Sequence, residues 1–299
     1  MKKIIVTGSN GLLGQSLVAS LLDERDKYQV FGFSKGKNRS KRIDFRYKEI
    51  DLTEKELFTK CLNQVKPDVI VNTAAMTQVD QCEDEKEKCD ALNIGVVKSL
   101  ADYAQKNGTY LVHISTDFIF DGKEGNYKET DIPNPVNYYG ISKLKAEQVL
   151  SNSNVNCAIL RTILVYGQVY NMHRSNIVLW VKKSLEQNKK IKVVNDQYRM
   201  PTYVDTLAGA CKLSIQKRSS GIFNISSNIL LSIYEMALQI AEIFDLNKDL
   251  IQPITSKELN QRAKRPEKTG FNLTKSKREL GLEVFSFKED LQKFKQKIT

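Results

Sequence analysis

Short apolar runs alternate with longer amphipathic stretches through the first half of the chain. Between the first two runs, Leu13, Leu17 and Leu21 recur at every fourth position, the spacing of a helix that packs one face on a sheet. Strands that alternate with helices in this way form a parallel sheet with helical crossovers. The apolar runs that we expect to be its strands are residues 3–6, 29–33, 46–50, 68–72, 110–115 and 157–161.

The pattern loosens after about residue 165. We expect helices near residues 176–187 and 232–244, a short strand at 191–194 and a last helix after residue 286. The fold class is therefore α/β: a doubly wound parallel sheet (Rossmann) with a smaller C-terminal α/β substrate lobe. We predict a nucleotide-binding domain at residues 1–165, to which some later strands and helices return, and a substrate-binding lobe at residues 166–299.

Residues 256–278 form a basic and polar segment within this second part. Two interpretations stay open here. The segment is either a loop that closes over a ligand or, before Phe271, a disordered linker.

Composition limits the classes of function. Hydrophobic residues make up 41% and charged residues 27%, and no apolar stretch approaches the roughly 18 residues of a membrane span, so we expect a soluble protein. The apolar run at the start ends at Thr7 and Gly8, which indicates a first strand rather than a signal peptide. Five scattered cysteines and two histidines predict no metal site, and reduced thiols fit a cytoplasmic protein.

The formal net charge of +11 is spread along the chain without a nucleic-acid-binding motif. We therefore expect neither a nucleic-acid nor a membrane partner. An anionic small substrate and a solubilising surface both account for the charge. A homodimer is one assembly that the sequence leaves open.

A glycine-rich turn follows the first strand directly and opens the first helix. Its spacing is Gly-x-x-Gly-x-x-Gly, and glycines there let backbone N–H groups approach a pyrophosphate at the positive end of a helix. This spacing resembles that of the extended short-chain dehydrogenases. The cofactor contacts expected from the turn are Gly8, Asn10, Gly11, Leu12, Leu13 and Gly14.

The end of the second strand favours NADP over NAD. An NAD enzyme places an acidic residue there for the adenosine ribose, whereas this chain has Ser34 and Lys35, and then Arg39 within a basic run that ends at residue 42. Such donors suit a 2′-phosphate, although a solvated basic loop is the alternative and NAD is not excluded. Ala74 and Ala75, after the fourth strand, are small residues where the backbone must pass near the cofactor.

Tyr139 and Lys143 lie four residues apart and therefore on one face of a helix. Reduction of a carbonyl needs a proton donor, and a lysine cation together with an oxidised nicotinamide would lower the pKa of a tyrosine toward the working pH. Lys143 can also hold the nicotinamide ribose. Thr116 ends the fifth strand, where ligands gather in open parallel sheets, and its hydroxyl can orient the substrate carbonyl.

The run from Ser115 to Gly122 (STDFIFDG), with Tyr139 and Lys143, resembles the dTDP-4-dehydrorhamnose reductase family. Residues 72–80 (NTAAMTQVD) and 194–198 (VNDQY) agree, and the match spans nearly the whole chain. The resemblance implies that NADPH or NADH reduces the 4-keto group of a 6-deoxy sugar on a nucleotide diphosphate, with Tyr139 as proton donor. It also implies adenine contacts at Asp51 and Leu52, and sugar contacts at Thr116, Asp117 and Gln197.

Two positions depart from that family. Leu164 stands where the family usually has a tryptophan at the substrate site, and Arg199 stands where a glycine is usual. Both are candidate substrate contacts, so the nucleotide or the sugar can differ. Leu164 as core filler and Arg199 as a surface residue are the alternatives.

Two other functions share this fold. One is a nucleotide-sugar dehydratase or epimerase; dehydratases of this superfamily generally have Asp-Glu after the catalytic threonine, whereas here Asp117 is followed by Phe118. A non-catalytic NADP-binding subunit, such as the regulatory subunit of methionine adenosyltransferase, resembles these reductases too. Intact Thr116, Tyr139 and Lys143 favour catalysis.

Overall fold

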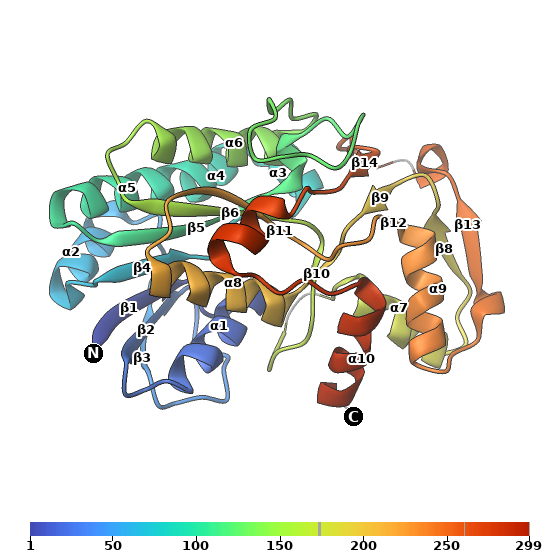
Figure 1. The fold of residues 1–299 in the computed structure, drawn as a ribbon, viewed down its shortest axis with the longest axis horizontal. Helices are drawn as coiled ribbons and strands as arrows, with labels where there is room; N and C mark the ends of the chain where they lie inside the picture. The colour runs from blue at the N-terminus through green and yellow to red at the C-terminus, as the bar shows by residue number, and fades with distance from the viewer. Residues whose placement is uncertain (173–174, 260, 299) are drawn as a thin grey trace.

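The computed structural model of the chain describes residues 1–172, 175–259 and 261–298, and its centre is one parallel sheet (Figure 1). Seven strands pair in the order β11-β6-β5-β4-β1-β2-β3, and every pairing is parallel. The strands are β1 (Lys2–Thr7), β2 (Tyr28–Ser34), β3 (Arg46–Glu49), β4 (Val69–Asn72), β5 (Tyr110–Thr116), β6 (Cys157–Thr162) and β11 (Gly221–Ile225).

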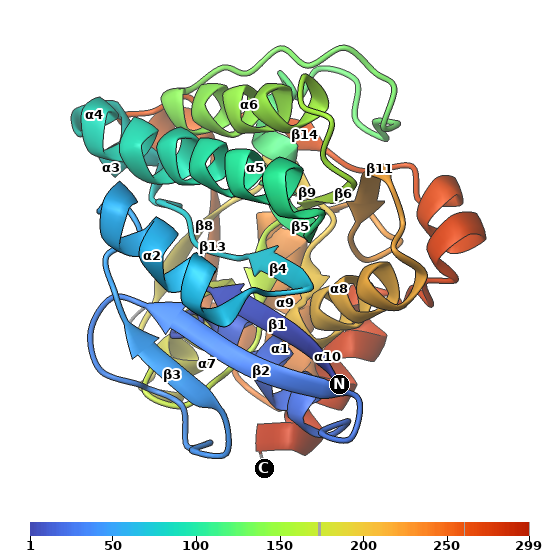
Figure 2. The ribbon, with the colours of Figure 1, turned by 90° about the vertical axis from the view of Figure 1, so that its left-hand side faces the viewer.

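Helices cover both faces of the sheet (Figure 2). One face carries α1 (Leu12–Leu22) and α8 (Val204–Lys217), and the other carries α2 (Lys55–Val65), α5 (Val96–Asn107) and α6 (Tyr138–Ser151). A strand covered on both sides is expected to be largely apolar, and β4 is buried at every position, with Asn72 as its one polar residue. The predicted doubly wound Rossmann sheet is therefore confirmed.

Shorter helical segments complete this part. Between β4 and α5 the chain forms α3 (Val79–Asp84), α4 (Lys86–Asp90) and a π-helical turn (Ala91–Gly95), and a 3₁₀ turn (Asp117–Ile119) follows β5.

The smaller lobe lies beyond the carboxyl end of the sheet. Its helices are α7 (Ile177–Glu186) and α9 (Ile233–Ile243), beside the parallel pair β8 (Ile191–Val194) and β13 (Ile251–Ile254). Short strands join the two parts, namely β7 (Val165–Tyr166) with β10 (Thr202–Tyr203), and β9 (Tyr198–Arg199) with β12 (Leu231–Ser232) and β14 (Lys268–Thr269). The last helix is α10 (Phe287–Ile298).

Two elements from the later part of the chain belong to the sheet. Strand β11 pairs with β6, and α8 packs against α1 and beneath β5 and β6. One hydrophobic cluster runs from Leu17 of α1 through Leu207 of α8 to Met236 of α9, so the two parts share a core. The boundary at residue 165 stays a prediction.

The basic segment at 256–278 makes specific contacts, apart from Asn260, which lies outside the described residues. The guanidinium of Arg265 donates to both carboxylate oxygens of Asp80, at 2.7 and 2.8 Å, and the Tyr198 amide donates to the Glu267 carbonyl at 2.7 Å. These contacts favour a fixed loop over the linker that the sequence left open.

Among the described residues, no helix is both long and apolar enough to cross a membrane. All five cysteines are buried and carry free thiols.

Candidate active site

The carboxyl ends of β1, β4 and β5 meet at one edge of the sheet. The order of the strands reverses between β1 and β4, because β1 pairs with β2 on one side and with β4 on the other. Thr7 is paired in register with Asn72, and Asn72 with His113. Ligands of doubly wound sheets bind at such a reversal point, so this edge is the natural position for the site.

The glycine turn packs tightly over this edge. A Cβ on Gly14 would lie 2.3 Å from the Gly8 carbonyl oxygen, and a Cβ on Gly8 would lie 2.8 Å from the Ala74 amide nitrogen. Gly8 also has a φ of +65°, which favours glycine. Helix α1 begins just after Gly11, and among the described residues no side chain caps its first amides. The turn therefore fits a pyrophosphate. Ala74 lies beside Gly8, and cofactor contacts at Ala74 and Ala75 stay a prediction.

Asn10 connects the turn to the basic loop rather than pointing outward. Its side-chain nitrogen donates to the carbonyls of Lys35 and Lys37, at 3.2 and 3.0 Å, and its oxygen accepts from the Arg39 amide at 3.0 Å. The Lys35 ammonium pairs with Asp51 at 2.9 Å. Lys35 and Asp51, both predicted to contact the cofactor, therefore form an ion pair with each other. Ser34 and Leu52 are buried, at the end of β2 and after β3.

Tyr139 lies in the first turn of α6, and Gly140 brings that turn against the end of β5. A Cβ on Gly140 would lie 2.1 Å from the Phe118 carbonyl oxygen, so a larger residue would push Tyr139 away. Asn137 caps the helix by accepting from the Gly140 amide at 2.9 Å. The Tyr139 ring meets the Phe118 ring edge-on at 6.0 Å between centroids, and its hydroxyl is hydrogen-bonded with Thr116. The structure thus brings the predicted pair Thr116 and Tyr139 together.

Burial raises the pKa of Tyr139, and the hydrogen bond with Thr116 opposes that rise. We expected Lys143 and an oxidised nicotinamide to lower this pKa. In the protein without cofactor, burial has the larger effect, because removal of the phenol from water outweighs the charges around it. The lowering in the complex with oxidised nicotinamide stays a prediction. A raised pKa keeps the phenol protonated, as a proton donor in carbonyl reduction requires.

Lys143 is buried one turn further along α6. Its Nζ donates to the Ile114 carbonyl at 2.6 Å and lies 3.1 Å from His113 Nε2. Burial lowers the pKa of Lys143 to about 8, against the opposing charges of Glu147 and Cys89. The lysine therefore titrates within the range in which enzymes work.

Two buried polar residues around this pair, His113 and Asn93, were not predicted from the sequence. His113 lies on β5 and contacts Asn72 with its other ring nitrogen, Nδ1, at 3.1 Å. Asn93, in the π-helical turn, donates to the Ser142 hydroxyl at 2.9 Å, between Tyr139 and Lys143. A histidine in an otherwise apolar strand was the available signal for the first, whereas a π-helical turn has no such sequence signal.

Asp117 and Arg199 lie together in the interior. Asp117 accepts from Thr269 at 2.5 Å and from Thr116 at 3.0 Å, and burial raises its pKa although the Arg199 charge opposes the rise. Arg199 is only 3% exposed, and its Nη atoms donate to the carbonyls of residues 198, 266 and 267 at 2.7–3.1 Å. The surface alternative for Arg199 is therefore wrong. Its guanidinium positions the segment around β14 over Asp117.

The other two predicted substrate contacts differ in exposure. Leu164 is 37% exposed and has a φ of +39°, so the core alternative is wrong and the side chain stands at the surface between β6 and β7. Gln197 is buried, and its amide nitrogen lies 3.4 Å from the Gln261 side-chain oxygen. Only Leu164 of the two is open to a ligand in this arrangement.

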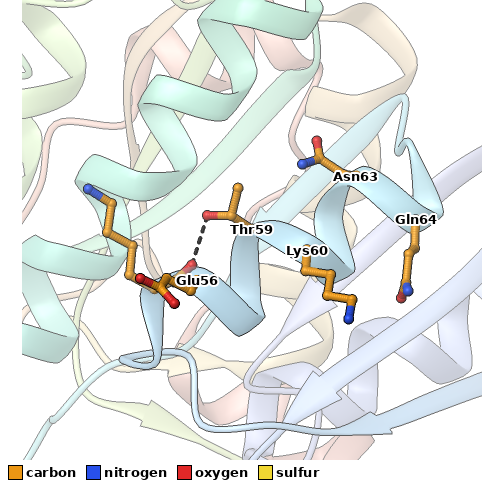
Figure 3. Close-up of a pocket in the computed structure, with 6 residues that line it drawn as sticks. Glu56, Thr59, Lys60, Asn63 and Gln64 are labelled. Carbon is orange, nitrogen blue, oxygen red and sulfur yellow. Dashed lines mark hydrogen bonds between the residues drawn. The ribbon is translucent and has the colours of Figure 1, made fainter.

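A surface depression outside this region runs along α2 (Figure 3). Its lining side chains all come from that one helix and include none of the site residues. In the part of the chain that the structure describes, no three histidine, cysteine or carboxylate side chains are grouped to hold a metal ion. The residues lining the depression on α2 are Lys55, Glu56, Thr59, Lys60, Asn63 and Gln64. The carboxyl edge of the sheet is therefore the candidate active site.

Comparison with known proteins decides the family. The family described as "RmlD substrate binding domain" matches residues 1–299. This chain belongs to the RmlD family. The dTDP-4-dehydrorhamnose reductase of Aggregatibacter actinomycetemcomitans is 32% identical over 98% of both chains. The methionine adenosyltransferase 2 subunit beta of Rattus norvegicus is 31% identical over 85% of this chain and 75% of its own length.

Solved structures agree with the RmlD assignment. The dTDP-4-dehydrorhamnose reductase of Bacillus anthracis, solved in complex with NADP, superposes with a TM-score of 0.87 at 28% identity, over 99% of each chain. A dTDP-glucose 4,6-dehydratase of the same organism, in complex with NAD, has a TM-score of 0.84 at 20% identity and shows the shared fold alone. The resemblance predicted from the sequence is confirmed.

Proposed function

We propose that this protein is an NADPH-dependent reductase that acts on the 4-keto group of a nucleotide-linked 6-deoxy sugar. The observation that carries the proposal is the pairing of Thr116 with Tyr139 at the carboxyl edge of the sheet, beside the glycine turn. A full-length relative that is 32% identical is a dTDP-4-dehydrorhamnose reductase, and a solved reductase of the same kind binds NADP.

When bound at the glycine turn, the cofactor supplies a hydride to the substrate carbonyl carbon. Tyr139 holds its proton because burial raises its pKa, and donates it to the carbonyl oxygen as that oxygen gains negative charge. Thr116 orients that oxygen through its hydroxyl. Lys143 supplies positive charge from beneath, fixed by the Ile114 carbonyl and His113.

The experiment is a panel of 4-keto nucleotide sugars that differ in base and sugar, followed through the loss of absorbance of the reduced nicotinamide. We expect turnover with at least one 4-keto-6-deoxy sugar and with NADPH in preference to NADH. Turnover with none of them would contradict the proposal. Leu164 is the residue to exchange for tryptophan if dTDP sugars react poorly, because it is exposed and stands where the family usually has that ring.

A second candidate is a non-catalytic subunit of methionine adenosyltransferase. The observation that favours it is the 31% identity to such a subunit over 85% of this chain. Recovery of a stoichiometric methionine adenosyltransferase with the tagged protein, together with no ketone reduction across the panel, would support this candidate. Turnover without a bound partner would contradict it.

A further inference from the structure

A buried chain of polar side chains leads from Lys143 into the sheet. Lys143 Nζ lies 3.1 Å from His113 Nε2, and His113 Nδ1 lies 3.1 Å from the Asn72 side-chain nitrogen. The Asn72 side-chain oxygen accepts from the Thr7 hydroxyl at 2.6 Å. All four side chains are at most 2% exposed, and they come from α6, β5, β4 and β1. Three neighbouring strands therefore contribute to the surroundings of one lysine.

We propose that His113 is a positioning residue that fixes Lys143 and matches its charge state by exchanging imidazole tautomers, with Asn72 as the second partner. The proposal rests on the proposed function, because Lys143 acts there in the reductase site. His113 is 1% exposed and lies on β5 within the sheet, so we assign it no contact with the substrate.

The hydrogen bonds in the structure fit the neutral amine form of Lys143. The Asn72 side chain donates to His113 Nδ1, so the ring proton resides on Nε2 and points at Lys143 Nζ. The lone pair of a neutral amine can accept a hydrogen bond from this Nε2 proton. The amine itself donates to the Ile114 carbonyl. Every polar atom of this arrangement has a partner.

The ammonium form requires the opposite arrangement. An ammonium has no lone pair, so Nζ must donate to Nε2, and the ring proton moves to Nδ1. The Asn72 amide then turns over to present its oxygen to Nδ1 and its nitrogen to Thr7. In this change the protein takes up one proton from solvent, which becomes the third N–H of Lys143. The imidazole carries one proton, and is therefore neutral, in both forms. His113, Asn72 and Lys143 each keep a partner, and the Thr7 hydroxyl changes from donor to acceptor.

Burial is the main reason that the imidazole stays neutral. Burial, together with the Lys143 charge, holds the pKa of His113 well below its usual range. The other titratable groups that act on Lys143 are Glu147, from the next turn of α6, and Cys89, from α4. Glu147 forms an ion pair with Arg161 at 2.7 Å.

Imidazole ¹⁵N spectra of the full-length protein between pH 6 and 10 test this directly. The chain has two histidines, and the signals that vanish in His113→Gln identify His113. We expect a neutral ring that carries its proton on Nδ1 at low pH and on Nε2 at high pH, with a midpoint near the pKa of Lys143. The change should disappear in Lys143→Met. Protonation of His113 with a midpoint near its ordinary pKa, or one tautomer throughout, would overturn the proposal.

A matched pair of variants tests the role in turnover. A glutamine amide reaches about as far as Nε2 and can still accept from Lys143, whereas an asparagine amide reaches only to the position of Nδ1. We expect that in His113→Asn the fall of kcat/KM at alkaline pH occurs about one to two pH units lower, because a hydrogen bond to the charged form of Lys143 is lost. His113→Gln should leave this fall at its original pH. Equal shifts of the pH profile in both variants, with unchanged Tm, would overturn the positioning role of His113.

The two proposals fail in different ways. If no sugar of the panel reacts, the proposed function fails while the ¹⁵N spectra remain readable, because they need no substrate. If the panel gives turnover but the tautomer does not change with pH, only the role of His113 fails.

Discussion

Tyr139 and Lys143 lie one turn apart on α6 but in different surroundings. Tyr139 is half-buried and hydrogen-bonded with Thr116, whereas Lys143 is 2% exposed and bonded within the sheet. Burial disfavours the charged form of both, so it raises the pKa of the phenol and lowers the pKa of the amine. The raised pKa suits the proton donor that we propose, and the lowered pKa suits a cation whose charge changes with pH.

Replacement of Tyr139 by phenylalanine should lower kcat by roughly a hundred- to ten-thousand-fold, because general acid catalysis is lost. NADPH affinity, measured by fluorescence titration, should change little, since the ring and its contact with Phe118 remain. The matched control is Tyr138→Phe, the neighbouring residue on the same helix, which should keep most of the activity. Equal losses in the two variants would remove the assigned role of Tyr139.

The rate of reduction should fall as the pH rises through about 8, because burial lowers the pKa of Lys143 to about 8. The rate falls rather than rises because the ammonium of Lys143 is present below this pH, and its positive charge is lost above it. A profile of kcat/KM between pH 6 and 10 measures the limb. A limb that persists unchanged in Lys143→Met would show that another group titrates.

Strands β1 to β6 and helix α1 could be predicted because each has its own pattern of apolar residues, whereas β11 and α8, which return to the sheet late in the chain, were not located. The buried run of β4 and the four-residue repeat of α1 are of this kind, and β8 has the predicted bounds. The two-residue strands β7, β9, β10, β12 and β14 were missed, since their pairing depends on distant partners. The same holds for the site: Tyr139 and Lys143 follow from spacing on one helix, whereas His113 and Arg199 acquire their partners only in the folded chain.

Helix α6 is attached to the sheet by one buried ion pair, Arg161 of β6 with Glu147. Both side chains are at most 4% exposed, and two Arg161 nitrogens donate to the carboxylate at 2.7–3.3 Å. Arg161→Ala should lower the free energy of unfolding by about 3–5 kcal/mol, because it leaves a buried carboxylate unpaired. Urea unfolding measures the change.

The double variant Arg161→Met with Glu147→Met is the control for that ion pair. It should cost much less than Arg161→Ala, because it leaves no charge in the interior. If the double variant is as unstable as the single one, the loss comes from packing rather than from the unpaired charge.

At the scale of the whole molecule, the basic loop and the net charge of +11 favour polyanionic ligands. The Lys35 ammonium pairs with Asp51, so a 2′-phosphate must compete with that carboxylate. Asn10 fixes the backbone of the loop on the glycine turn, which holds Lys35 and Arg39 near the expected position of the adenosine ribose.

NADPH at a hundred times its Kd should raise the free energy of unfolding by about 2.7 kcal/mol, and NADH at the same concentration by less. In the double variant Lys35→Ala with Arg39→Ala, the shifts in Tm with the two cofactors should become equal. Lys60→Ala with Lys106→Ala removes the same charge from α2 and α5 and should keep the preference for NADPH. Loss of the preference in both double variants would assign it to net charge rather than to the loop.

The sheet has a further consequence for how the chain reaches its native state during synthesis. Strand β6 ends at Thr162, but β11, which pairs with it along its length, begins only at Gly221. While the ribosome makes the residues between them, β6 is an exposed edge, open to pairing with other chains. A nascent chain stalled in this interval, or a gene truncated there, should therefore depend on chaperones although the glycine turn, Tyr139 and Lys143 have already been made.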